Sequence, residues 1–218
     1  MTEQKHSYQE CWKLNKEDNK MAKYYVTIAR QFGSLGRPIA RELSEMLGIE
    51  YYDRDIVEAA SRELNMPVSV IHSEEEKSVK SNFLNMLFPL GTDSIDKQDK
   101  IFEAQKKIIT DFAEKDSSIF VGRCADYILR DYPNVLNIYI YAPENERYLN
   151  CVNALKMSPK EAKKMMEEVD RAREQYWHRY AGHSPADFES THLMINSSLF
   201  GIHDTAKILA DIVKDRFL

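Results

Sequence analysis

Short apolar segments alternate along the chain with longer segments in which apolar residues recur every three or four positions. We interpret the short ones, which are rich in β-branched and aromatic residues, as buried strands, and the longer ones as amphipathic helices. The expected strands are 24–29, 49–52, 118–122, 135–141 and 193–196. The expected helices are 38–47, 56–65, 101–115, 125–131, a charged helical region at 144–181, and 205–213. Strands separated by helices predict an α/β fold, a five-stranded parallel sheet with helices on both faces.

Two segments depart from this pattern. Residues 1–22 are densely charged with only a weak apolar pattern, and we interpret them as an N-terminal extension. A loosely docked extension and a partner-binding helix both fit these residues. Residues 66–98 combine an acidic run with an apolar stretch of weak periodicity, which indicates a partly helical insertion. The remainder of 23–218 is long enough to form one domain with a sizeable core.

The junction between the first strand and the first helix carries the most informative chemistry. A glycine-containing loop (RQFGSLGRP) leads directly into the helix, and this order forms an anion cradle from loop amides and a helix N-terminus. The usual phosphate-loop frame, G-x-x-x-x-G-K-[ST], places Gln31 at the first glycine, Arg37 at the lysine and Pro38 at the Ser/Thr. Pro38 lacks both the hydroxyl that reaches Mg²⁺ and an amide for the phosphates. The sequence therefore predicts a variant phosphate loop.

Charged residues follow the other strands at the same edge of the expected sheet. Arg30 follows the first strand, Asp53 follows the second, Arg123 and Asp126 follow the third, and Arg147 follows the fourth. Ligands of open parallel sheets gather beyond the carboxyl ends of the strands. Arginines and carboxylates converging there suit a polyphosphate together with a hydrogen-bonding base.

Composition narrows the class of protein. The net charge of −5 over 218 residues argues against a general nucleic-acid binder. No segment approaches the roughly 18 apolar residues of a membrane span, and the polar N-terminus lacks a signal core, so we expect no membrane partner and a cytoplasmic address. Three widely spaced cysteines and six scattered histidines predict neither a disulfide framework nor a metal site. Whether the chain forms a homo-oligomer stays open.

The segments IARQFGSLGRPIARELSEMLGIEYYDRDIV, VGRCADYIL and INSS together resemble the cytidylate-kinase-like proteins, a branch of the P-loop nucleoside monophosphate kinases. The resemblance runs from about residue 24 to the C-terminus. It implies a P-loop NTPase-type fold with a small helical acceptor-binding insertion at about 66–98 and a lid at about 150–185.

The resemblance also implies roles for individual residues. Asp53, Arg123 and Asp126 match positions that face the acceptor nucleotide, and Arg171 and Arg173 match lid arginines that stabilise the transferring phosphoryl group. Arg37 would act both in holding ATP and in catalysis, in place of the lysine. The ATP phosphates would be held by the loop residues Gln31, Gly33, Ser34, Leu35, Gly36, Arg37 and Pro38.

The expected function is transfer of the γ-phosphoryl group of ATP to a nucleoside monophosphate, with CMP or dCMP favoured and Mg²⁺ as cofactor. Because Pro38 offers no hydroxyl, either Ser34 or Asp53 replaces it at the metal, or nucleotide oxygens and water hold the ion. Two alternatives remain open. One is a nucleotide sensor that binds without turnover, and the other is a kinase for a different small acceptor.

Overall fold

The computed structural model describes residues 22–64 and 95–218. The predictions made for the N-terminal extension and for nearly all of the insertion therefore lie outside the described residues. Within the described ranges, no helix combines the length and the apolar character needed to cross a bilayer.

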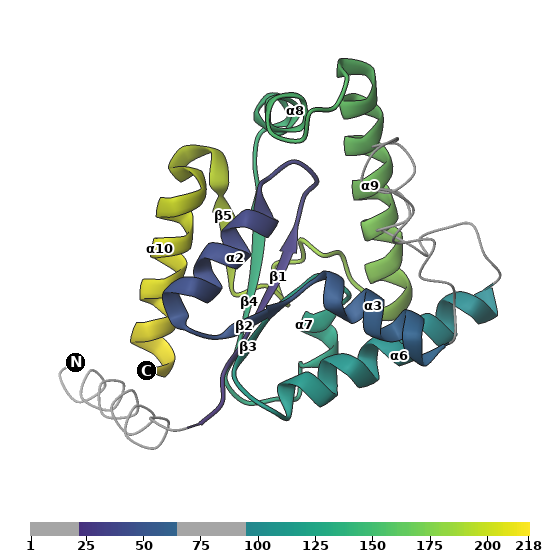
Figure 1. Cartoon of the computed structure of the whole chain (residues 1–218), viewed down its shortest axis with the longest axis vertical. Coiled ribbons are helices and arrows are strands. Elements are labelled where there is room, and N and C mark those ends of the chain that lie inside the picture. The colour runs from purple at the N-terminus through teal and green to yellow at the C-terminus, as the bar shows by residue number, and fades with distance from the viewer. Residues whose placement is uncertain (1–21, 65–94) are drawn as a thin grey trace, which may run out of the picture.

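The centre of the fold is one sheet of five parallel strands in the order β2-β3-β1-β4-β5 (Figure 1). Val26 pairs with Ile119 on one side of β1 and with Leu136 on the other. This confirms the predicted five-stranded parallel sheet, and every predicted strand is present. The strands are β1 (Tyr25–Arg30), β2 (Glu50–Tyr52), β3 (Ser118–Val121), β4 (Val135–Tyr141) and β5 (Leu193–Asn196).

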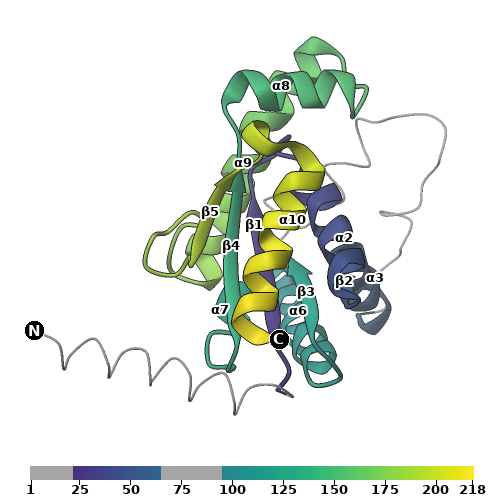
Figure 2. The same cartoon turned by 90° about the vertical axis from the view of Figure 1, so that its left-hand side faces the viewer.

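Helices cover both faces of the sheet. The described helices are α2 (Gly36–Leu47), α3 (Arg54–Glu63), α6 (Ile95–Ala113), α7 (Ala125–Ile128), α8 (Glu144–Asn153), α9 (Pro159–Tyr180) and α10 (Ser197–Phe217). The two-residue alternation of a strand directs Val26 and Ile28 to the core beneath α2 and α10, and Tyr25 and Ala29 to the core beneath α3, α6 and α7. Figure 2 shows α10 lying lengthwise along the sheet beside α2.

The region 144–181 forms two helices rather than one. The break is explained by a helix start at Ser158, whose side chain accepts a hydrogen bond from the Glu161 amide while its own amide donates to the Glu161 carboxylate. Pro159 follows at the first helical position, where its missing amide costs no hydrogen bond. Figure 1 shows α8 above the carboxyl end of the sheet and α9 running down beside the sheet toward α6. The lid expected at about 150–185 falls largely on these two helices, and its role stays a prediction.

The last helix begins earlier than its apolar pattern predicts. It starts at Ser197, directly after β5, because the Asn196 side chain accepts a hydrogen bond from the Ser198 amide. Gly201, with φ of 71°, then kinks it. The early start places Ser197 against the loop that follows β1, where it contributes to the site.

Candidate active site

The loop between β1 and α2 has the backbone of an anion cradle. Gly33 and Leu35 have φ of 79° and 61°, in the left-handed region, and α2 begins immediately afterwards at Gly36. Gly36 has no room for a side chain, since an added Cβ would lie 2.9 Å from Cβ and Cγ of Arg30. The loop therefore turns sharply over the end of β1 and presents the N-terminus of α2 at the carboxyl edge of the sheet.

The polar side chains of the loop fix it to the sheet. Gln31 accepts a hydrogen bond from the Ala142 amide at 3.2 Å. The fully buried Ser34 hydroxyl lies 2.9 Å from the Gln31 carbonyl and 3.1 Å from the Ile140 carbonyl, and Ser197 donates to the Ser34 carbonyl at 2.7 Å. The structure thus gives Ser34 a structural role. Its hydroxyl faces backbone carbonyls, so it does not replace the hydroxyl that Pro38 lacks.

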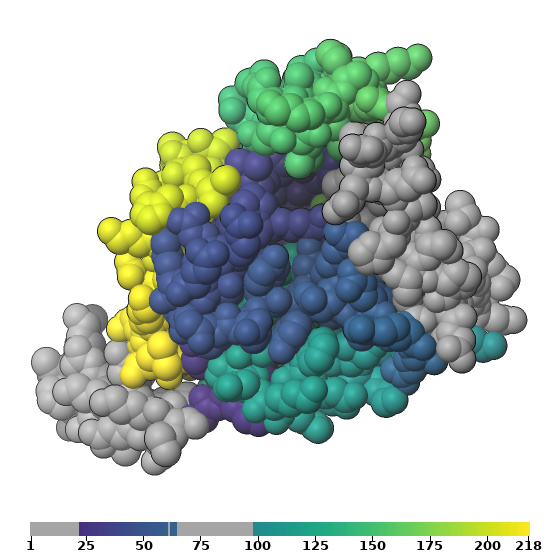
Figure 3. Space-filling model, in the orientation of Figure 1, coloured from purple at the N-terminus to yellow at the C-terminus, as the bar shows by residue number. Residues whose placement is uncertain are grey.

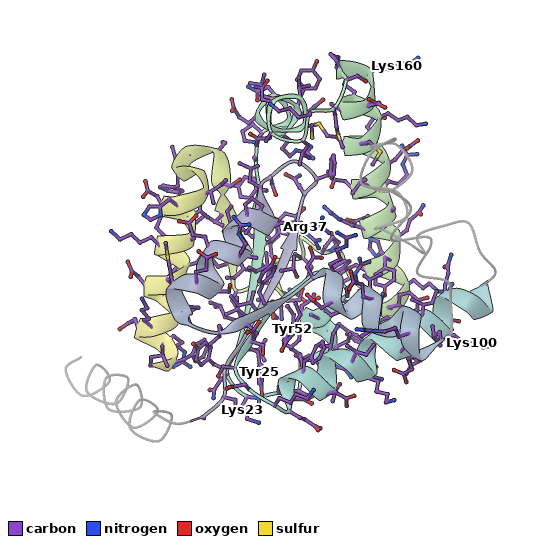
Figure 4. The ribbon with its side chains drawn as sticks, in the orientation of Figure 1. Lys23, Tyr25, Arg37, Tyr52, Lys100 and Lys160 are labelled. Carbon is purple, nitrogen blue, oxygen red and sulfur yellow. The ribbon has the colours of Figure 1, made fainter. Side chains whose placement is uncertain are left out.

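Four arginines surround the buried Asp53 carboxylate. Its Oδ2 pairs with Arg37 Nε, and its Oδ1 lies 3.5 Å from Arg30 Nη2. Arg123 and Arg173 are each 9% exposed, and each interacts electrostatically with the Asp53 carboxylate. Figure 4 shows Arg37 near the centre of the molecule at the start of α2, with Lys23 toward the opposite end of the sheet.

The pKa values of these groups show a surplus of positive charge. Burial would raise the pKa of Asp53, but Arg30, Arg37 and Arg123 outweigh it, so the pKa lies below the ordinary value. Burial lowers the pKa of Arg30 and of Arg123, with Asp53 opposing, and it lowers the pKa of Arg173 to about 10 despite Asp170. Asp53 and Asp170 are two carboxylates among the guanidinium groups of Arg30, Arg37, Arg123, Arg147 and Arg173, so positive charge is in excess. A bound anion would relieve their mutual repulsion.

The turn after β3 brings Arg123 into this cluster. Gly122, Arg123 and Cys124 have φ of 79°, 59° and 52°, three left-handed residues in succession. A Cβ added to Gly122 would displace the buried Arg30 guanidinium, because it would overlap with Nη1 of Arg30. Non-glycine residues rarely adopt this backbone, and such strain gathers at functional sites. The turn places the buried Arg123 close enough to Arg30 to lower the pKa of Arg30 electrostatically, a smaller effect than burial.

Asp126 lies in a different environment. Both of its carboxylate oxygens accept from Trp177 Nε1 at 3.1 Å, and His183 Nε2 lies 3.9 Å away. Burial raises the pKa of Asp126, while Trp177 and His183 oppose the rise. Its first contacts are therefore with α9 and the segment after it, whereas Asp53 and Arg123 share the arginine cluster.

The two expected lid arginines differ in position. Arg173 is buried and donates from Nη1 to the Arg30 carbonyl at 2.8 Å, which joins α9 to the end of β1. Arg171 is exposed on the same helix. Two helix positions that are two residues apart lie about 200° apart around the axis, so Arg171 and Arg173 cannot both face the loop. Arg171 remains a predicted site residue that the structure places at the surface.

Three further residues belong to the site beyond those assigned roles from the sequence. Arg30 and Arg147 were placed at the sheet edge without a role, and Asp170 was not singled out. Asp170 Oδ2 accepts from Arg147 Nη1 at 2.5 Å, and its Oδ1 lies 3.7 Å from Arg173 Nη1. The spacing of Asp170 and Arg173, three residues apart on one helix face, was the available signal.

The residues present fit a nucleotide polyphosphate. Loop amides, the α2 N-terminus and the arginine cluster are the groups that bind phosphate oxygens. Among the described residues there is no group of three or more His, Cys, Asp or Glu arranged to hold a metal ion. Mg²⁺ would fit as an ion held mainly by nucleotide oxygens and water.

This fold and this loop define a P-loop kinase architecture. A model of the cytidylate kinase-like family matches residues 13–199, and the chain therefore belongs to that family. No curated protein matches the chain at a significant level.

Solved structures share the fold at low sequence identity. An uncharacterized protein from Eubacterium ventriosum ATCC 27560 has a TM-score of 0.68 at 20% identity, covering 89% of this chain and 100% of that one. Shikimate kinase from Bacteroides thetaiotaomicron has a TM-score of 0.53 at 10% identity, with coverages of 88% and 99%. Shikimate kinase from Acinetobacter baumannii, in complex with shikimate, has a TM-score of 0.50 at 12% identity, with coverages of 93% and 99%. These similarities concern the fold, and the acceptor stays open.

Proposed function

We propose that the chain transfers the γ-phosphoryl group of ATP to a nucleoside monophosphate, with CMP or dCMP as the favoured acceptor. The observation that carries this proposal is the convergence of Arg30, Arg37, Arg123 and Arg173 on Asp53 beside a phosphate loop. Phosphoryl transfer depends mainly on positioning and on neutralising phosphate charge, and this cluster supplies both.

The donor would lie on the loop from Gln31 to Pro38. Loop amides and the α2 N-terminus would hold its phosphates, and Arg37 would take the place of the usual lysine. A guanidinium binds two phosphate oxygens at once, whereas an ammonium acts as a point charge. Arg37 is the most exposed of the arginines on Asp53, with 35% of its side chain accessible, so it can exchange the carboxylate for an incoming phosphate. Mg²⁺ bound to ATP would neutralise charge on the phosphate oxygens.

The acceptor would lie against the turn that follows β3. A carboxylate can accept from the N4 amino group of cytosine while a guanidinium donates to O2 or N3, so Asp53, Arg123 and Asp126 offer suitable chemistry. Membership of the cytidylate kinase-like family supports this choice. The acceptor phosphate is already an anion, so the reaction requires no dedicated general base. Arg173 would stabilise charge on the phosphoryl group in transit.

A nucleotide sensor without turnover is the second candidate. One observation favours it. Pro38 has no hydroxyl for Mg²⁺, and the Ser34 hydroxyl lies against two backbone carbonyls. A kinase for another small acceptor keeps the same donor site and differs only in the acceptor.

The test is a coupled assay of ADP release with Mg-ATP and a panel of CMP, dCMP, UMP, AMP and GMP. We expect turnover with CMP or dCMP, strongly reduced in Arg37→Ala and Arg173→Ala. Turnover only with AMP or GMP would retain the reaction class and reject the base assignment. ATP binding with no turnover on any acceptor would favour the sensor.

A further inference from the structure

Phe32 lies in the middle of the phosphate loop, yet its side chain points into the lid. It is 3% exposed. Its surroundings are apolar side chains of α8, of α9 and of the turn between them: Cys151, Met157, Ala162, Met165, Met166 and Val169. Figure 3 shows the loop directly beneath α8 and α9. Raising the lid would expose Phe32 and this apolar cluster to water, which is unfavourable in proportion to the area exposed.

Hydrogen bonds to the loop backbone add to the apolar contact between Phe32 and the lid. The Phe32 amide donates to Asp170 Oδ1 at 2.7 Å, and the Phe32 carbonyl accepts from Arg147 Nη1 at 3.2 Å. The next carbonyl, of Gly33, accepts from Asn150 Nδ2 at 2.9 Å. Both helices of the lid therefore bind Phe32, and α8 also binds Gly33.

Asp170 extends this connection to the lid arginine. It pairs with Arg147 and lies beside Arg173, which in turn donates to the Arg30 carbonyl at the end of β1. Separation of the lid from the loop would leave these largely buried polar groups without their partners, and such loss is costly. The apolar and the polar contacts oppose the same motion.

We infer that Phe32 and Asp170 are positioning residues that hold the α8–α9 lid on the phosphate loop before any nucleotide binds. Arg173 is then in place in the free protein, and the anion site is assembled in advance. The consequence for catalysis rests on the proposed function. A ligand that finds the competent state already populated binds with its full intrinsic affinity, whereas an open lid would reduce apparent affinity by the closed fraction.

Cys151 gives a direct probe of this contact in the free protein. Its thiol is fully buried in the cluster around Phe32, and burial raises its pKa to about 11. Cys124 is equally buried in the core beneath α6 and α7 and serves as an internal control. Labelling with N-ethylmaleimide, quantified for each cysteine by peptide mass spectrometry, reports how often each thiol becomes exposed.

We expect slow labelling of both thiols in the wild type. Phe32→Ala should accelerate labelling of Cys151 by about tenfold or more, the change expected when the closed fraction falls, without accelerating Cys124. Phe32→Leu should restore most of the protection, and Asp170→Asn should give an intermediate rate. Phe217→Ala, a matched truncation at the opposite end of the sheet where Phe217 stacks on Tyr24, should leave the ratio of the two rates unchanged.

Fast labelling of Cys151 in the wild type, or equal acceleration of both thiols in Phe32→Ala, would overturn the inference. A kinetic readout separates positioning from general loss of structure. Phe32→Ala should raise KM for ATP by a larger factor than it lowers kcat, because saturating ATP returns the lid to the loop, and a proportional fall in active protein would lower kcat alone. The labelling needs no ligand, so its result stands even if no acceptor supports turnover.

Discussion

Arg37, at the lysine position of the phosphate loop, forms an ion pair with Asp53 at the carboxyl end of β2. The cation expected to hold the donor phosphates is thus joined to a carboxylate expected to face the acceptor. Oδ1 of the same carboxylate lies near Arg30, so Asp53 links the loop to the buried end of β1. If the two proposed roles hold, Asp53 would couple the donor site to the acceptor site.

Substitution of Asp53 tests the charge balance of the cluster. Asp53→Asn retains the shape of the side chain and leaves the buried Arg30 without its carboxylate, so the free energy of unfolding should fall by about 3 kcal/mol. Chemical denaturation measures this change. Asp55→Asn, at an exposed position in the first turn of α3, should change stability by less than about 0.5 kcal/mol. Equal effects of the two variants would contradict the assigned charge balance.

The two site carboxylates should give opposite dependences of stability on pH. The pKa of Asp53 lies below its ordinary value of 3.8 in the folded protein, so its stabilisation is complete above that value and is lost as pH falls through the folded pKa. The pKa of Asp126 is raised, so its carboxylate disfavours folding at neutral pH and this penalty disappears as pH falls.

In denaturation measured from pH 7 to pH 3, the stability gap between wild type and Asp53→Asn should narrow below about pH 4. Asp126→Asn should have its most favourable effect relative to wild type at neutral pH and lose it in acid. A gap that stays constant for both variants would contradict the stated pKa directions.

The two lid arginines should differ in their effect on turnover. Arg173 is buried against the end of β1, and its replacement by Ala should lower kcat by about 10²–10³-fold, as expected for loss of a preorganised donor. Arg171→Ala should have a clearly smaller effect, since Arg171 is exposed. Lys164→Ala, on the exposed surface of the same helix, serves as the control for unspecific effects on α9. Steady-state kinetics under saturating ATP and acceptor decide between these outcomes, and a larger loss in Arg171→Ala would contradict the geometry.

Substitution of two glycines by alanine distinguishes the cost of backbone strain from the effect of the close contact between loop and lid. Gly33 and Gly48 both have positive φ, but a Cβ on Gly33 would lie 2.7 Å from the Arg147 carbonyl oxygen, whereas a Cβ on Gly48 meets nothing within 4 Å. Gly33→Ala and Gly48→Ala should share a strain cost of about 1–2 kcal/mol. Only Gly33→Ala should also weaken ATP binding, because it displaces α8 from the loop. Calorimetric titration with ATP measures this, and equal affinities in the two variants would reject the contact.

The strands of the sheet could be predicted from the sequence because each buried strand is a short, continuous segment of apolar residues. The pattern at 135–141 and 193–196 predicted β4 and β5 to the residue. Helix ends were harder, because local hydrogen bonds set them. Asn196 starts α10 well before its apolar pattern begins, and the Ser158 capping box divides one charged region into α8 and α9. The Ser158–Glu161 spacing was a readable signal for that division.

The sequence places Asp53 and Arg123 at one edge of the sheet, and their roles there stay predictions. Placement of Asp53 and Arg123 at strand ends sufficed to bring them together. The direction of Phe32 could not be predicted, since nothing in a loop's periodicity shows whether a side chain turns toward the sheet or toward a lid. The burial of Arg30 also required the structure, because it depends on the space left by Gly36 and Gly122.

We propose that this arginine cluster catalyses phosphoryl transfer from ATP to a nucleoside monophosphate. The most direct measurement follows the label from γ-³²P-ATP into the acceptor in the presence of Mg²⁺ and CMP, with separation of the nucleotides after reaction. We predict labelled CDP, formed in proportion to enzyme and nearly absent in Arg173→Ala. Absence of labelled nucleoside diphosphate with CMP, dCMP, UMP, AMP and GMP alike, in protein that binds ATP, would contradict the claim.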